Sequence, residues 1–232
     1  MKGNELLTRQ KLPLLIFVIW AFLALGVVAQ VTGLLKGSFP IFTVVWILIP
    51  LIAVLLAKDA DRVGFRPIPW RDLACTTAIN LATLLVLMLI FEPWSHTYQH
   101  LIGLALAGQS PDTTFAWLLI FPKIPALGAI FLFSGLVTLF GEELFFRGWL
   151  LQLLKRRWGA VWTVILQAFL FTIPNLPVAF VLPALQGFLY ILVYTFLGIG
   201  LIGGWAASRT NSIWPSLLSA TLCNLILVAL IK

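Results

Sequence analysis

The sequence predicts an all-α integral membrane protein, a bundle of seven to eight transmembrane helices with a cytoplasmic N-terminus. Of its 232 residues 61% are hydrophobic and only 10% are charged, and the mean hydropathy is +1.06. Apolar stretches of about 20 residues, each long enough to cross a ~30 Å hydrocarbon layer, recur along the whole chain. These runs lack the alternation of a β-barrel, so helices must satisfy the backbone in lipid. We expect one membrane domain over residues 1–232.

Apolar runs between polar breaks define the predicted spans. They cover residues 14–35, 40–57, 72–92, 124–154, 158–174, 187–207 and 213–231. A shorter apolar pair, 98–107 and 114–121, is predicted to be re-entrant or interfacial, or to supply an eighth crossing. Residues 1–123 are thus interpreted as a set of N-terminal transmembrane helices.

Most basic residues fall on one side of this layout. They are Lys2, Arg9, Lys11, Lys58, Arg62, Arg66, Arg71, Lys155, Arg156, Arg157 and Arg209, with Lys36, Lys123 and Lys232 as exceptions. The opposite loops, 93–113 and 175–186, contain no Lys or Arg. Cytoplasmic loops of membrane proteins carry an excess of Lys and Arg. The net charge of +7 therefore indicates membrane topology rather than nucleic-acid binding. The expected location is a bacterial plasma membrane, or a thylakoid or other internal membrane.

Four glycines crowd the sixth predicted span: Gly198, Gly200, Gly203 and Gly204. Small residues allow membrane helices to approach closely, so we predict helix packing at this position.

Two adjacent carboxylates and an arginine stand at the end of a long apolar run, in "LFGEELFFRGWL". Glu143 and Arg147 are four residues apart and can pair along one helix face, while Glu142 lies about 100° around the axis. A charge at the bilayer centre costs at least ~2.5 to 3.5 kcal/mol, so such groups usually face a protein interior or a cavity. Alternatively, the three residues mark a helix end at the cytoplasmic interface.

Counting residues from the turns indicates the depth of the polar groups. Glu142 lies fourteen residues before Arg156, or about 21 Å along a helix. Asn175 and Asn224, counted from Gly159 and Thr210, lie about 24 Å and about 21 Å deep. This common depth predicts a shared polar site, although each Asn alone is also typical of an interhelical hydrogen bond.

At these residues the chain resembles the CPBP intramembrane proteases, which include the type II CAAX prenyl proteases and bacterial proteins of bacteriocin processing and self-immunity. The resemblance covers residues 137–227. Its EExxxR motif runs from Glu142 to Arg147 and is followed by Gly148 and a basic segment, "LLKRRWG". The Gly-rich helix, the short polar turn and the "SIWPS" start of the last helix also follow the family's pattern.

The resemblance implies a glutamic-type intramembrane endopeptidase in which the first glutamate activates water, assisted by two histidines and an asparagine. The implied site residues are Glu142, Glu143, Arg147, Asn175 and Asn224. This chain departs from the pattern twice, because its FxxxH motif ends in Asn175 and its HxxxN motif begins with Ala220. Asn cannot ionise and Ala can neither donate nor accept a proton, so both proton shuttles are missing.

The only two histidines of the chain, His96 and His100, offer one alternative source of imidazole. Their segment is predicted to be the outer loop after the third span, where an interfacial role near Trp94 is the competing interpretation. No metal or other cofactor is expected, because a catalytic zinc usually needs three protein ligands and the sequence has no HExxH motif.

Three functions stay open at this point. The first is a non-catalytic family member whose buried cavity binds a membrane peptide or a partner protein. The second is an active endopeptidase acting on membrane or prenylated proteins. The third is a small transporter that uses the same buried polar groups. All three imply contact with the lipid bilayer, and none involves nucleic acid.

Overall fold

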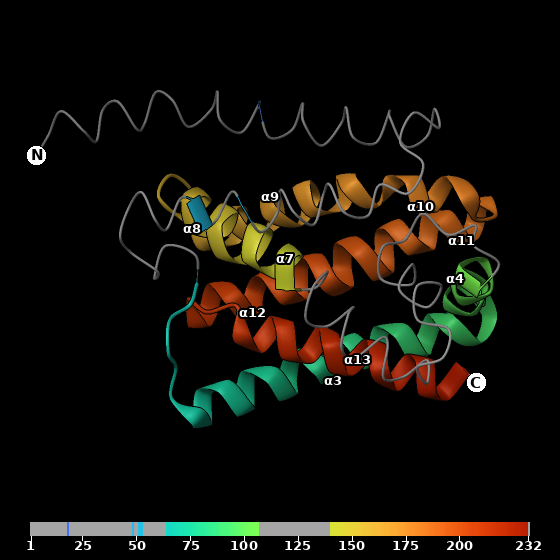
Figure 1. The fold of residues 1–232 in the computed structure, drawn as a ribbon, viewed down its shortest axis with the longest axis horizontal. Helices are drawn as coiled ribbons and strands as arrows, with labels where there is room; N and C mark the ends of the chain where they lie inside the picture. Colours follow the sequence, from blue (N-terminus) through green and yellow to red (C-terminus); the bar gives the residue numbers. More distant parts are fainter. Residues whose placement is uncertain (1–17, 19–47, 49–50, 53–63, 107–139, 232) are drawn as a thin grey trace, which may run out of the picture.

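The computed structural model describes residues 18, 48, 51–52, 64–106 and 140–231 (Figure 1). The predicted spans 14–35 and 40–57, the segment 114–121 and the first half of the span 124–154 lie almost wholly outside these residues. Within the described part the chain is helical, and its one extended pairing is an isolated antiparallel bridge between Phe65 and Ser212. The all-α prediction is confirmed at this level.

The described part of the chain forms twelve helical elements, and residues 107–139 separate the second from the third. They are α3 (Trp70–Ser95), α4 (Thr97–Leu106), α7 (Phe140–Glu142), η3 (Glu143–Leu150), α8 (Leu151–Lys155), α9 (Ala160–Thr172), η4 (Ile173–Asn175), α10 (Leu176–Val181), α11 (Ala184–Leu189), η5 (Tyr190–Ile202), α12 (Gly203–Thr210) and α13 (Trp214–Ile231).

Three helical units of the described residues are long and apolar enough to cross a membrane: Trp70–Ser95, Ala160–Val181 and Ala184–Thr210. The protein is therefore an integral membrane protein. The total of seven to eight crossings and the cytoplasmic N-terminus stay predictions, because they depend on residues outside the described part.

The prediction of a loop over 175–186 is wrong. Helix α9 continues through η4 into α10 and ends at Val181, and α11 begins at Ala184, so the turn is confined to Leu182 and Pro183. Pro174 and Pro177 do not end the helix. Each lies in the first turn of its own segment, where the backbone N–H that proline lacks is not needed for a helical hydrogen bond.

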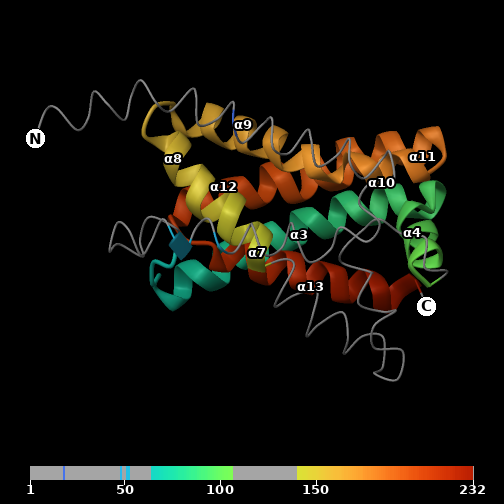
Figure 2. The same ribbon diagram turned by 45° about the horizontal axis from the view of Figure 1, so that its top comes forward.

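The helices form two pairs that lie side by side: α9–α10 is antiparallel to η5–α12, whereas α3 and α13 run in the same direction (Figures 1 and 2). The unit α9–α10 packs along η5 and α12, and α13 packs along α3, which also contacts η5. Helix α4 crosses the end of the bundle beside α10 and α11, and the segment from α7 to α8 starts against α13, where Phe140 contacts Leu217 and Ala220. The start of η3 thus lies where both pairs meet.

Two of these elements, η3 and η5, are π-helical over 8 and 13 residues, which the sequence analysis did not predict. Such wide turns are rare and occur most often at functional sites. The predicted close packing at the glycines is present: a Cβ added to Gly200 would lie 2.8 Å from the Thr195 carbonyl oxygen and 3.0 Å from the Ala168 Cβ of α9.

Replacing Gly200 by Ala should therefore destabilise the bundle by roughly 1–3 kcal/mol, since neither the backbone of η5 nor that of α9 can move freely. The matched control is Gly103→Ala on α4, where the added methyl meets nothing within 4 Å. The free energy of unfolding in detergent measures both variants. Equal stability of the two would contradict the packing role.

Candidate functional site

The Glu143–Arg147 pair that the sequence predicts is a buried ion pair in the structure. Arg147 and Glu143 are each only 1% exposed, and Arg147 Nη1 lies 3.5 Å from Glu143 Oε1. Both residues stand on η3, four positions apart, as the spacing predicts. Arg147 also lies with its guanidinium 3.9 Å from the centre of the Phe171 ring on α9.

Each partner of this pair also holds a different helix. The Ser216 hydroxyl, in the first turn of α13, donates to Glu143 Oε2. Arg147 Nη2 donates to the Ile199 carbonyl oxygen of η5 at 2.7 Å. The same Ile199 carbonyl oxygen also accepts the backbone N–H of Gly203, where η5 passes into α12. The pair therefore fixes η3 against α9, η5 and α13 at once.

Beside this pair lies a small cavity of about 50 Å³, room for one or two water molecules. It is lined by Glu142, Asn175 and Asn224, which come from three separate segments, together with Ala220. The other lining residues are Leu84, Met88, Tyr98, Phe171, Tyr190, Tyr194, Thr195, Ile199 and Cys223. Glu142, Asn175 and Asn224, which the sequence predicts at a common depth, thus face one cavity. Glu143 and Arg147 do not line it.

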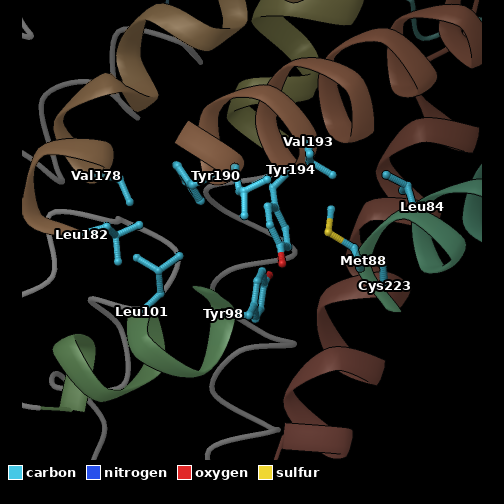
Figure 3. Packing of buried hydrophobic residues seen from close by; sticks show 11 residues of the cluster. Leu84, Met88, Tyr98, Leu101, Val178, Leu182, Tyr190, Val193, Tyr194 and Cys223 are labelled. Atoms are coloured by element: carbon cyan, nitrogen blue, oxygen red, sulfur yellow. The ribbon is translucent and has the colours of Figure 1, made fainter. Parts of the chain in front are cut away.

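All three tyrosines of the chain line this cavity. Tyr98 stacks on Tyr194 with ring centres 6.1 Å apart, and Tyr190 stacks on the other side of Tyr194 at 6.4 Å (Figure 3). The Tyr98 hydroxyl donates to Asn224 Oδ1 at 2.6 Å, and the Tyr190 hydroxyl donates to Asn175 Oδ1 at 3.3 Å. Each asparagine oxygen is therefore occupied by a tyrosine of a different helix.

The amide nitrogen of Asn175 also forms a hydrogen bond. Asn175 Nδ2 donates to the Phe171 carbonyl oxygen at 3.0 Å, one turn earlier on its own helix. An amide NH₂ carries two hydrogens, so Asn175 keeps one for another acceptor. Each asparagine oxygen accepts one hydrogen bond from a tyrosine, and the amide N–H groups can donate to a ligand in the cavity.

The sequence analysis missed the contribution of α3 and α4. Glu92 is a buried carboxylate whose oxygens accept the backbone N–H groups of Tyr98 and Gln99 at 3.0 Å, so it caps the first turn of α4. It also accepts the Tyr194 hydroxyl at 2.7 Å, which places it directly behind the cavity wall. The sequence does contain a signal for this role, because Glu92 is an acidic residue at the end of an apolar run and such residues often belong to functional sites.

The two histidines do not reach the site. His96 is the left-handed residue between α3 and α4, and His100 stands on α4. Neither lines the cavity, and among its described lining residues there is no imidazole and no ammonium group. Ala220 and Asn175 occupy the wall where the sequence resemblance places two histidines.

Comparison with known proteins agrees with this arrangement. Residues 124–226 match the family model for type II CAAX prenyl endopeptidase Rce1-like proteins. This part of the chain is therefore similar to CAAX prenyl endopeptidases. The matched region contains the Glu142–Glu143–Arg147 cluster, both asparagines and the described elements from α7 to α12 with most of α13. No curated protein and no solved structure matches the chain.

The Glu143–Arg147 ion pair should stabilise the fold by holding the helices in position. Arg147→Met leaves Glu143 buried without its cation, and we expect a loss of about 3–5 kcal/mol in the free energy of unfolding. The double variant Glu143→Gln, Arg147→Met should recover much of this loss, because no charge remains unpaired and Gln can still accept from Ser216. Chemical unfolding in mixed micelles measures the free energy of unfolding of the two single variants and of the double variant. A double variant as unstable as the sum of the singles would contradict the pairing.

Proposed function

We propose that this CAAX protease-like protein binds a peptide segment of a membrane protein in the Glu142 cavity, and that its ability to cleave that segment is impaired or lost. One observation carries the proposal. Asn175 and Ala220, which stand at the two histidine positions of the family pattern, line the same cavity as Glu142. The proton-shuttling groups are therefore replaced in the site itself.

The cavity offers good partners for a peptide group. The NH₂ groups of Asn175 and Asn224 can donate to a peptide carbonyl, while the tyrosine bonds to their oxygens hold the amides in place. Glu142 can accept from a peptide N–H or from water. Leu84, Met88 and other apolar lining residues can contact an apolar side chain. A volume of about 50 Å³ means that the helices must separate somewhat to admit a peptide.

Hydrolysis demands more than binding. Water must lose a proton to a base as it attacks the carbonyl carbon, and the C–N bond breaks only when the leaving nitrogen gains a proton. Glu142 can take the first proton, but Ala220 has no group for the second transfer and Asn175 cannot ionise. Positioned proton transfer is commonly worth about 100- to 10,000-fold in rate, and we expect a loss of this order.

The second candidate is an active endopeptidase that uses other proton donors. The cavity holds the hydroxyls of Tyr98, Tyr190 and Tyr194, and a tyrosine can act as a general acid. Each hydroxyl already donates to Asn224, Asn175 or Glu92, so a transfer would have to break a bond within the site. This cost makes the binding function the better supported of the two.

A thiol in the cavity wall supplies a direct test of binding. Cys223 lines the cavity, and Cys75, the second cysteine of the chain, lies elsewhere and is exposed. With Cys75→Ser in nanodiscs, a bound transmembrane peptide should slow the reaction of Cys223 with N-ethylmaleimide. Prenylated and unprenylated peptides are compared, and Asn224→Leu should lower the affinity. Mass spectrometry of the same samples should show no cleavage, or slow cleavage.

Two outcomes would overturn this function. Rapid cleavage that disappears in Glu142→Ala would establish an active endopeptidase. The absence of both protection and cleavage, with every peptide tested, would exclude peptide binding in the cavity.

The tyrosine bonds make a further prediction about affinity. Tyr98→Phe removes the donor of a 2.6 Å bond and leaves Asn224 Oδ1 buried without it, a change typically worth about 1–3 kcal/mol. Tyr190→Phe removes a longer bond of 3.3 Å from an amide that Phe171 also holds. Peptide affinity should therefore fall more in Tyr98→Phe than in Tyr190→Phe. Equal affinities in the two variants would contradict the orienting role of Tyr98.

A further inference from the structure

A second, larger space of about 480 Å³ opens at the end of the bundle where α3 begins and α12 ends. Arg66 and Arg209 line it together with Thr210, Asn211 and Asp72. Ile68 and Ile79 supply its apolar part, and Cys75 also faces it. This cleft shares no lining residue with the Glu142 cavity, so nothing in the proposed peptide binding accounts for it.

The fold holds the two arginines together although they are far apart in sequence. The Ile213 N–H donates to the Gly64 carbonyl oxygen at 3.0 Å, and Phe65 pairs with Ser212 beside it. Gly64 has a φ of +75°, and a Cβ there would lie 2.9 Å from Ile213 Cγ2, so the position requires glycine. The segment that carries Arg66 is thus fixed against the turn that follows Arg209 (Figure 2).

The charge of the cleft favours an anion. Arg66 and Arg209 are exposed, and neither forms an ion pair with a carboxylate of the described residues. Lys155 at the same end is already engaged, since its Nζ donates to Asn211 Oδ1 at 2.8 Å. Asp72 is the acidic lining residue, and it leaves the cleft with a net positive charge. The uncapped first turn of α3 adds a partial positive charge.

An apolar surface leads away from the cleft along α3. Ile79, Val86 and Ile90 are 51%, 55% and 57% exposed, and their spacing of seven and four residues places them on one helix face. Ile79 is also a lining residue of the cleft, so the charged space and the apolar face are continuous. Trp70 at the start of α3 is 78% exposed, as is typical of a residue at the membrane interface.

We propose that this cleft binds the headgroup of an acidic phospholipid. Arg66 and Arg209 contact the phosphate, Thr210 and Asn211 face the polar part of the headgroup, and the acyl chains follow the exposed face of α3. Planar guanidinium groups are well suited to phosphate oxygens. The apolar continuation favours a lipid over a free anion, which would gain nothing from Ile79 or Val86.

Cys75 provides the readout. In nanodiscs of phosphatidylcholine with added phosphatidylglycerol, the uncharged reagent N-ethylmaleimide should modify Cys75 more slowly than in phosphatidylcholine alone. Each arginine near an acidic membrane surface is worth roughly fivefold in affinity, so Arg66→Gln with Arg209→Gln should abolish most of this protection. Native mass spectrometry of the same proteins should show fewer retained acidic lipids in the double variant.

Three controls separate the possible outcomes. Arg157→Gln, an exposed arginine that also stacks on a tryptophan, should keep full protection. Arg66→Lys with Arg209→Lys should keep part of it, and unchanged Cys223 labelling should show an intact bundle in every variant. Equal labelling of Cys75 in both membranes would overturn the proposal. If inorganic phosphate protects Cys75 equally well, the ligand is a free anion and not a lipid. If Arg157→Gln also loses the protection, the effect comes from general surface charge and not from the cleft.

Discussion

The buried ion pair between Glu143 and Arg147 is the interaction on which the rest of the structure depends. An isolated charge in this position would be costly, and the pair is tolerable because Ser216 and the Ile199 carbonyl satisfy part of it. Those same bonds hold α13 and η5 against η3. Glu142, the residue immediately before Glu143, consequently faces the place where these helices meet. The pair positions the site without lining it.

The site combines the donors of a peptide-binding surface with a shortage of proton-transfer groups. Tyr98 and Tyr190 occupy the asparagine oxygens, and Glu92 caps α4 while it holds Tyr194. Three tyrosines, two amides and the Glu92 carboxylate therefore form a network whose members orient one another. Glu142 lies within the region that is similar to CAAX prenyl endopeptidases. The replacement of both histidines explains why we favour binding over cleavage.

The local motifs were predictable from the sequence, and the long-range contacts were not. The pairing of Glu143 with Arg147 follows from their spacing of four, and the common depth of Asn175 and Asn224 follows from counting along helices. The helical course of residues 175–186 was missed because the segment falls between two apolar runs, and its prolines stand where a helix start tolerates them. The roles of Glu92 and Tyr98 depend on how α4 crosses the bundle end, which no local pattern encodes.

The central claim is that this scaffold lacks only its proton shuttles. Restoring them in Asn175→His with Ala220→His tests it most directly, with cleavage of a bound transmembrane peptide measured by mass spectrometry. We expect the double variant to cleave at least about 100-fold faster than the unaltered protein, and to lose that activity when Glu142 is changed to Ala. A double variant that binds the peptide with unchanged affinity and still does not cleave it would contradict the account.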